Sequence, residues 1–223
     1  MYKTLSFLLL VSLPVLDIGA QQPDPVAMAS AYAQDVQQNA VLMRQYSWKM
    51  RVEVTVKDEI KPPKIYQMRF DADGRPQKTL LTAEEKQKKK RGFRGRVQKK
   101  KVTAMKEWAG ELADVVKTYT TATPGTMLDF YAKAKITPEA DGTIKIEGTG
   151  FMQPGDTATF WLDQQTKRAR RFTFATILDG DSMTGEVQYA RVPGGPSYAA
   201  QTVIDIPAKK VRAKVETFDY VKQ

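Results

Sequence analysis

Hydrophobic residues recur along this chain with two different periods, and the points of change mark its elements. Over 24–43 they stand three or four residues apart, and Pro25 suits a first helical turn, so an amphipathic helix is predicted. From 47 to 57 every second residue is apolar, which is typical of a strand with one buried face. The side chains that share this face are Trp48, Met50, Val52, Val54 and Val56.

The alternation continues beyond the first strand. After Pro62-Pro63 it resumes over 66–70, and a turn at 71–74 leads into a short strand at 77–82. From 141 to the end, turn residues separate short alternating segments, so the strands there are expected to form an antiparallel meander. These segments are 144–146, 158–162, 172–178, 187–189, 198–206 and 211–215.

Two further helical patterns lie between the early and the late strands. One apolar stripe covers 105–119, and a shorter one covers 124–134. Thr123 followed by Pro124 is the signature of a helix cap with proline in the first turn.

Together these patterns predict an α+β protein with a curved antiparallel sheet, or half-open barrel, of about eight or nine strands or more. The helices are expected to pack in its concave face, because a sheet this wide exposes more apolar surface than it can cover alone. The space between sheet and helices is then either a filled core or an apolar cleft, and the pattern leaves both open.

The beginning of the chain has the order of a secretory signal peptide. Lys3 precedes an apolar block over 5–16, and small residues end at Ala20, where we expect cleavage. The block is shorter than the ~20 residues that span a bilayer, and Pro14 would also interrupt a buried first helix, which is the alternative. We therefore predict a signal peptide at 1–20 and one exported domain at 21–223. Because the chain has no Cys, we expect no lipid anchor on the new N-terminus.

All of the net charge is concentrated in one basic loop, which we define as residues 86–101. The loop holds ten Lys/Arg and no Asp or Glu, whereas the whole chain has 35 basic and 25 acidic residues and a net charge of +10. A neutral body with one cationic segment indicates a docking element or a solvated loop. The residues that we assign to binding an anionic partner are Lys88, Lys89, Lys90, Arg91, Arg94, Arg96, Lys99, Lys100 and Lys101.

Three interpretations of the basic loop remain. A Lys-rich segment with Gly92 and Gly95 cannot bury itself and could simply be solvated. Phe93 between arginines would suit stacking on a nucleic-acid base, but an exported protein meets little nucleic acid. Each Lys or Arg near an anionic membrane contributes about 1 kcal/mol, so docking on an anionic membrane surface or an acidic envelope protein is the functional interpretation that we favour.

The composition argues against enzymatic chemistry. The chain has no His and no Cys, which removes the commonest general base, the commonest metal ligand and the thiol nucleophile. The Asp-containing segments 71–74 and 179–181 lack the spacing and final Glu of a calcium loop and are predicted to be hairpin turns. We expect no catalytic residue, no metal site and no cofactor.

One segment resembles a known family. Phe160 to Thr166 (FWLDQQT), the following strand over 168–178 and the turn at 179–181 are similar to the LolA-like group of periplasmic lipoprotein-carrier proteins. The order of elements also agrees over nearly all of 21–223, although the basic loop departs from that group. The resemblance implies a half-open barrel whose apolar cavity can hold acyl chains, in a soluble periplasmic protein of the bacterial envelope.

Apolar residues of the helices and of the inner strand faces are candidates to line such a cavity, and each would serve a dry core equally well. These candidates are Trp48, Met105, Trp108, Leu112, Phe130, Tyr131, Phe160, Phe172 and Phe174. Two functions follow. The first is a binding or carrier protein that holds an acyl chain, a lipid or a lipidated partner while the basic loop docks. The second is a non-catalytic interaction module with a filled core, whose basic loop binds a partner protein.

Overall fold

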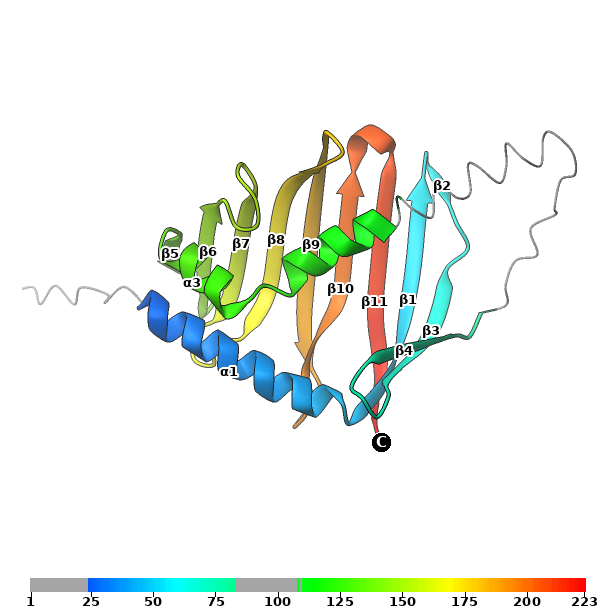
Figure 1. The fold of residues 1–223 in the computed structure, drawn as a ribbon, viewed down its shortest axis with the longest axis horizontal. Helices are drawn as coiled ribbons and strands as arrows, with labels where there is room; N and C mark the ends of the chain where they lie inside the picture. The colour runs from blue at the N-terminus through cyan, green and yellow to red at the C-terminus, as the bar shows by residue number, and fades with distance from the viewer. Residues whose placement is uncertain (1–23, 83–107, 109) are drawn as a thin grey trace, which may run out of the picture.

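Eleven strands pair antiparallel in one open, curved sheet, and the helices lie across one of its faces (Figure 1). The structure is a computed structural model that describes residues 24–82, 108 and 110–223. The predicted α+β class, with helices packed in the concave face of a sheet that does not close, is confirmed. The predicted signal peptide at 1–20 and the basic loop at 86–101 lie outside the described residues.

The strands follow the predicted alternation closely, and several extend further than predicted. They are β1 (Tyr46–Val56), β2 (Glu59–Ile60), β3 (Lys64–Phe70), β4 (Pro76–Leu80), β5 (Lys135–Pro138), β6 (Thr143–Thr149), β7 (Thr157–Asp163), β8 (Ala169–Leu178), β9 (Asp181–Arg191), β10 (Ser197–Ile206) and β11 (Val211–Lys222). The short strands β2 and β5 were not predicted, because two and four residues are too few to show a period.

The sheet pairs its first strand with its last. Its strand order is β4-β3-β1-β11-β10-β9-β8-β7-β6-β5, with β2 paired to β1. β1 pairs with β11 from Tyr46 opposite Lys222 to Val56 opposite Val211. The early strands therefore continue the late meander as one surface, and β4 and β5 form its two edges.

Two helices begin at the prolines that the sequence predicts for their first turns. α1 (Pro25–Met43) follows Asp24, whose Oδ1 accepts the N–H of Val26 at 3.0 Å. α3 (Pro124–Tyr131) follows Thr123, whose Oγ1 accepts the N–H of Thr126 at 3.1 Å. A further helix covers 110–120.

The helix predicted over 124–134 is shorter than expected, since α3 ends at Tyr131. Ala134 follows the helix, because the chain must turn there to enter β5 at Lys135.

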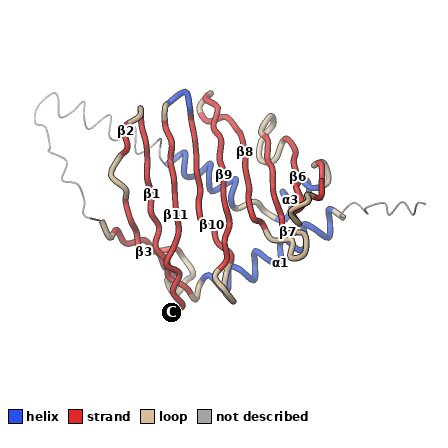
Figure 2. Tube along the Cα trace, turned by 180° about the vertical axis from the view of Figure 1, so that it is seen from behind, coloured by secondary structure: helices blue, strands red, loops and turns tan. Residues whose placement is uncertain are grey.

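Seen from behind, the strands lie in front and the helices behind them (Figure 2). The helices thus cover one face of the sheet, and the core lies between that face and the helices. Its largest fully buried side chains include Tyr131, Phe172, Met127, Ile146 and Met183.

Candidate ligand-binding face

The helix-covered face carries rows of side chains that run across the strands, and their burial changes along each row. Strand pairing gives one row in the order Ile146, Phe160, Phe172, Val187, Thr202, Val215 and Val52. The first four are at most 7% exposed, whereas the last three are only half-buried. The face is therefore dry over β6 to β9 and more accessible over β10, β11 and β1.

A neighbouring row shows the same gradient. Its order is Gly148, Ala158, Phe174, Gly185, Ile204, Ala213 and Val54. Ile204 is 5% exposed, while Ala213 and Val54 are half-buried. We call the half-buried inner-face residues of β11 and β1 the apolar strip; they are Ala213, Val215, Met50, Val52, Val54 and Val56.

An aromatic cluster fills the dry half of the face. Phe160 stacks on Phe172 with ring centroids 4.3 Å apart, and Phe172 stacks on Phe174 at 5.5 Å. Phe130 meets Phe160 edge-on at 5.7 Å, and Tyr131 lies 6.3 Å from Phe130. The structure thus brings together five of the predicted cavity residues, and all five are buried against one another.

Glycines allow this close aromatic packing. A Cβ on Gly148 would lie 2.9 Å from the ring of Phe130, and one on Gly185 would lie 2.1 Å from the ring of Phe174. Both glycines are in the same inner-face row, so this row leaves room for one ring of the sheet and one ring of α3.

The remaining candidates are divided between this core cluster and a second aromatic group. Trp108 and Leu112 are partly buried and pack against the core cluster, and Met105 lies outside the described residues. Trp48 is buried in a separate aromatic group, stacked on Tyr220 at 5.7 Å and tilted against Phe70 at 5.5 Å. Seven of the nine predicted residues therefore gather in or against one core cluster, while Trp48 lies apart from it, and the lining role of the set stays a prediction.

A buried carboxylate that the sequence did not reveal anchors the helix over 110–120. Asp156 is 1% exposed, and its oxygens accept the N–H groups of Phe151 at 2.6 Å, Met152 at 2.9 Å and Gln153 at 3.0 Å. Tyr119 donates its hydroxyl to the same carboxylate at 2.6 Å. Burial, and secondarily Asp156, raises the pKa of Tyr119.

This anchor also reaches β8, since Thr176 lies 2.9 Å from the Tyr119 hydroxyl. The C-terminal end of the helix is thereby tied to the loop before β7 and to the sheet. The sequence around Asp156 does not distinguish it from an exposed turn residue. Its hydrogen-bond donors are brought to it by the folding of its own loop and by Tyr119, 37 residues earlier in the chain.

The Asp-x-x-Thr segment that carried the family resemblance is a hairpin turn. Asp163 Oδ1 accepts the backbone N–H of Thr166 at 2.8 Å and its hydroxyl at 3.0 Å, and Arg170 pairs with the same carboxylate. These hydrogen bonds, the backbone N–H of Thr166 first, lower the pKa of Asp163 to about 2. The motif therefore closes the β7–β8 turn and contributes no ligand-binding group of its own.

Polar contacts hold α1 along one end of the sheet. Arg168 on the sheet side pairs with Asp35 at 2.8 Å, and Asn39 exchanges two hydrogen bonds with the backbone of Ser197 at 2.9 and 2.7 Å. The hydroxyl of Tyr32 donates to the carbonyl of Ala122 at 3.1 Å. α1 is thus fixed both to the strands and to the segment before α3.

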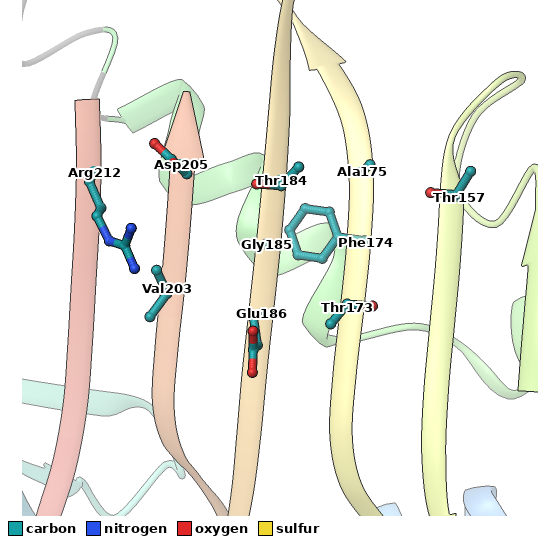
Figure 3. A pocket seen from close by; sticks show the side chains of 10 residues that line it. All are labelled: Thr157, Thr173, Phe174, Ala175, Thr184, Gly185, Glu186, Val203, Asp205 and Arg212. Carbon is teal, nitrogen blue, oxygen red and sulfur yellow. The ribbon is translucent and has the colours of Figure 1, made fainter. Parts of the chain in front are cut away.

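A depression of about 360 Å³ lies on the opposite, convex face of the sheet (Figure 3). Most of its lining residues alternate with the inward-facing ones, among them Thr173, Ala175 and Glu186, and Phe174 and Gly185 of the inner-face row also border it. This depression is not the predicted cavity, which would lie between the sheet and the helices.

Within the described part of the chain, there is no group of three or more His, Cys, Asp or Glu residues that could hold a metal ion. No helix among the described residues is long and apolar enough to cross a membrane. The nine basic-loop residues assigned to an anionic partner lie outside this part, so their role stays a prediction.

No protein-family model matches the chain, and no curated protein matches it in sequence. Solved structures similar to it include a DUF1329 family protein from Desulfovibrio piger, 8% identical with a TM-score of 0.46, over 90% of this chain and 94% of that one.

Two other similar structures are a lipoprotein-sorting protein domain and a LolA superfamily protein. A putative outer membrane lipoprotein-sorting protein domain from Vibrio parahaemolyticus is 11% identical with a TM-score of 0.41, over 87% of this chain and 93% of that one. A LolA superfamily protein from Nitrosomonas europaea is 12% identical with a TM-score of 0.37, over 86% of this chain and 93% of that one. A LolA superfamily structure is thus among those to which this chain is similar, and at these identities the likeness concerns the fold alone.

Proposed function

We propose that this chain is an exported periplasmic binding or carrier protein that holds an acyl chain, a lipid or a lipidated partner against the apolar strip. The observation that carries the proposal is the continuity of the inner-face rows. Side chains of the same apolar character are dry over β6 to β9 and only half-buried over β11 and β1. Each Å² of such surface gains roughly 25 cal/mol when it leaves water, so a bound apolar ligand would be stabilised there.

The dimensions and chemistry of the strip suit a hydrocarbon chain. From Met50 to Val56 the inner face of β1 offers only aliphatic side chains, over about 20 Å at a rise of ~3.3 Å per residue. β11 places Ala213 and Val215 beside them. A narrow, uncharged strip of this kind supports binding of an extended acyl chain over binding of a polar ligand.

The location and the docking step rest on the sequence. The signal-peptide pattern at 1–20 supports export, and the basic loop would hold the domain reversibly at an anionic membrane or an acidic envelope partner. Such docking would bring the apolar strip to a source of acyl chains.

A pair of adjacent substitutions tests this function. Val54→Asp places a carboxylate on the strip, while Thr55→Asp places the same group on the outer face of the same strand. Binding of a fluorescent fatty acid should weaken at least tenfold in Val54→Asp, because an unpaired carboxylate would face the acyl chain of the ligand. The same binding should change little in Thr55→Asp.

Native mass spectrometry of protein purified gently from the cell envelope provides the second readout. We expect extractable lipid on the wild-type protein. Only the mass of the free protein, together with no fatty-acid binding by the wild type, would refute the carrier function.

The second candidate, an interaction module with a filled core, is favoured by the aromatic cluster. Phe130, Phe160 and Phe172 pack face to face or edge to face and are at most 7% exposed. In that case neutralising Lys88, Lys89, Lys90 and Arg91 should abolish capture of a partner protein, and Val54→Asp should leave that capture unchanged.

A further inference from the structure

Trp108 carries a buried polar atom that is unused within the described part of the chain. Its indole Nε1 is shielded from solvent, and no hydrogen-bond acceptor among the described residues reaches it. Buried Trp N–H groups ordinarily have a partner, and an orphaned one requires an explanation.

The position of this residue connects it with the apolar strip. Trp108 has helical backbone two residues before the helix over 110–120, whose N-terminal end lies over the β11 side of the sheet and whose other end lies toward β8 (Figure 1). The far end is tied down by Tyr119, which hydrogen-bonds Asp156 at 2.6 Å. Trp108 therefore stands at the end of the helix nearer to β11 and β1, while its side chain packs against the core cluster.

The chemistry of the indole restricts what can satisfy it. The Nε1–H group is a donor only, so its partner must offer an oxygen or nitrogen lone pair. A hydrocarbon chain offers none, but the carbonyl oxygen of an ester-linked or amide-linked acyl chain does.

We infer that the Nε1–H of Trp108 donates a hydrogen bond to the carbonyl oxygen of an ester-linked or amide-linked acyl ligand whose hydrocarbon part lies on the apolar strip. This inference rests on the proposed carrier function and narrows its ligand class. Trp108 then selects acylated molecules over plain hydrocarbons, and the aliphatic strip supplies affinity without selecting between them.

The test compares two probes that differ in the acceptor. Diphenylhexatriene is an apolar fluorophore without a hydrogen-bonding group, and its fluorescence reports its own binding. Methyl palmitate carries an ester carbonyl, and its affinity is measured by its displacement of diphenylhexatriene. Trp108→Phe keeps an aromatic ring and removes the N–H. We expect its affinity for methyl palmitate to fall about three- to tenfold, the range of one net hydrogen bond, with diphenylhexatriene affinity nearly unchanged.

Trp161→Phe is the matched control. Trp161 lies on β7 next to the outward-facing Arg171, whose guanidinium is 4.7 Å from the ring centroid, so the same substitution is made away from the helices. It should alter neither affinity.

A second measurement applies to the wild-type protein and does not depend on the variant folding. In a spectrum of ¹⁵N-labelled indole groups, methyl palmitate should move the Trp108 signal downfield, and diphenylhexatriene should not. Suppose that the wild type binds both probes. The inference is then overturned if Trp108→Phe lowers the affinity for both probes equally or for neither. It is also overturned if the Trp108 indole signal does not respond to methyl palmitate. If the wild type binds neither probe, the proposed carrier function fails, and the inference fails with it.

Discussion

Replacing Asp156 by Asn tests whether the buried carboxylate fixes the helix over 110–120 to the sheet. Asn has nearly the same size, but one oxygen becomes an amide NH₂ that cannot accept a hydrogen bond. Four donors converge on this side chain, three of them backbone N–H groups and the fourth the hydroxyl of Tyr119. At least one donor must therefore face another donor in the variant.

The number and type of these hydrogen bonds give the expected loss of stability. Hydrogen bonds to a charged group contribute about 1.5–3 kcal/mol and neutral ones about 0.5–1.5 kcal/mol, so the surviving bonds weaken while one is lost. Because Asp156 is 1% exposed, water cannot replace the lost partner. We expect the free energy of unfolding to fall by about 3 kcal/mol, a large part of the ~5–15 kcal/mol that stabilises a typical domain.

Urea and thermal denaturation, followed by circular dichroism, measure this change. A loss of this size in a domain of about 200 residues lowers Tm by about 6–12 °C. Asp114→Asn is the control, since Asp114 is exposed on the same helix as Tyr119. An unfolding free energy of Asp156→Asn within about 0.5 kcal/mol of the wild type would refute the reasoning, because that is the range of an ordinary surface substitution.

Three other outcomes are expected. Gly185→Ala should cost about 1–3 kcal/mol of stability, since its Cβ would lie 2.1 Å from the ring of Phe174 (Figure 3), whereas Gly110→Ala on the helix has open space and should be neutral or stabilising in the same urea titration. Raising the pH above about 10, the ordinary pKa of tyrosine, should lower the urea midpoint. Burial raises the folded-state pKa of Tyr119, so the contribution of its protonated hydroxyl to stability is complete below pH ~10 and is lost as the pH rises toward the folded-state pKa. Tyr119→Phe should make the urea midpoint depend less steeply on pH, and an unchanged pH dependence would contradict this assignment. Replacing the four cations of 88–91 by Gln should weaken sedimentation of the protein with anionic vesicles and make it less dependent on salt. If the variant and the wild type sediment equally at every salt concentration, the basic loop has no docking role.

Much of the secondary structure could be predicted because the relevant signals are local. The two-residue alternation from 47 to 57 reflects which side chains of a strand share a face, and β1 occupies nearly the same residues. Asp24 and Thr123 cap helices through donors only two and three residues away. β5 was missed because a four-residue strand shows no period and gains its order from pairing with β6.

The candidate site was predictable only in its chemistry. The aromatic residues 130, 160 and 172 were recognised as inward-facing, and Phe160 and Phe172 on the sheet do meet Phe130 on α3 and fill the space between sheet and helix. Whether inward-facing residues line a cavity or a dry core depends on the distance between elements, which no alternation encodes.

The sequence by itself determined the class of this protein: an α+β chain with a one-sided sheet, helices to cover it, a signal-peptide pattern and one concentrated basic loop. Only the tertiary structure decided that β1 pairs with β11, which joins the early strands to the late meander and creates the half-exposed apolar strip. It also decided that Asp156 is a buried anchor for Tyr119. The physical reason is the same in both cases: these contacts join residues far apart in the chain, and their energies depend on burial and register that only the assembled sheet defines.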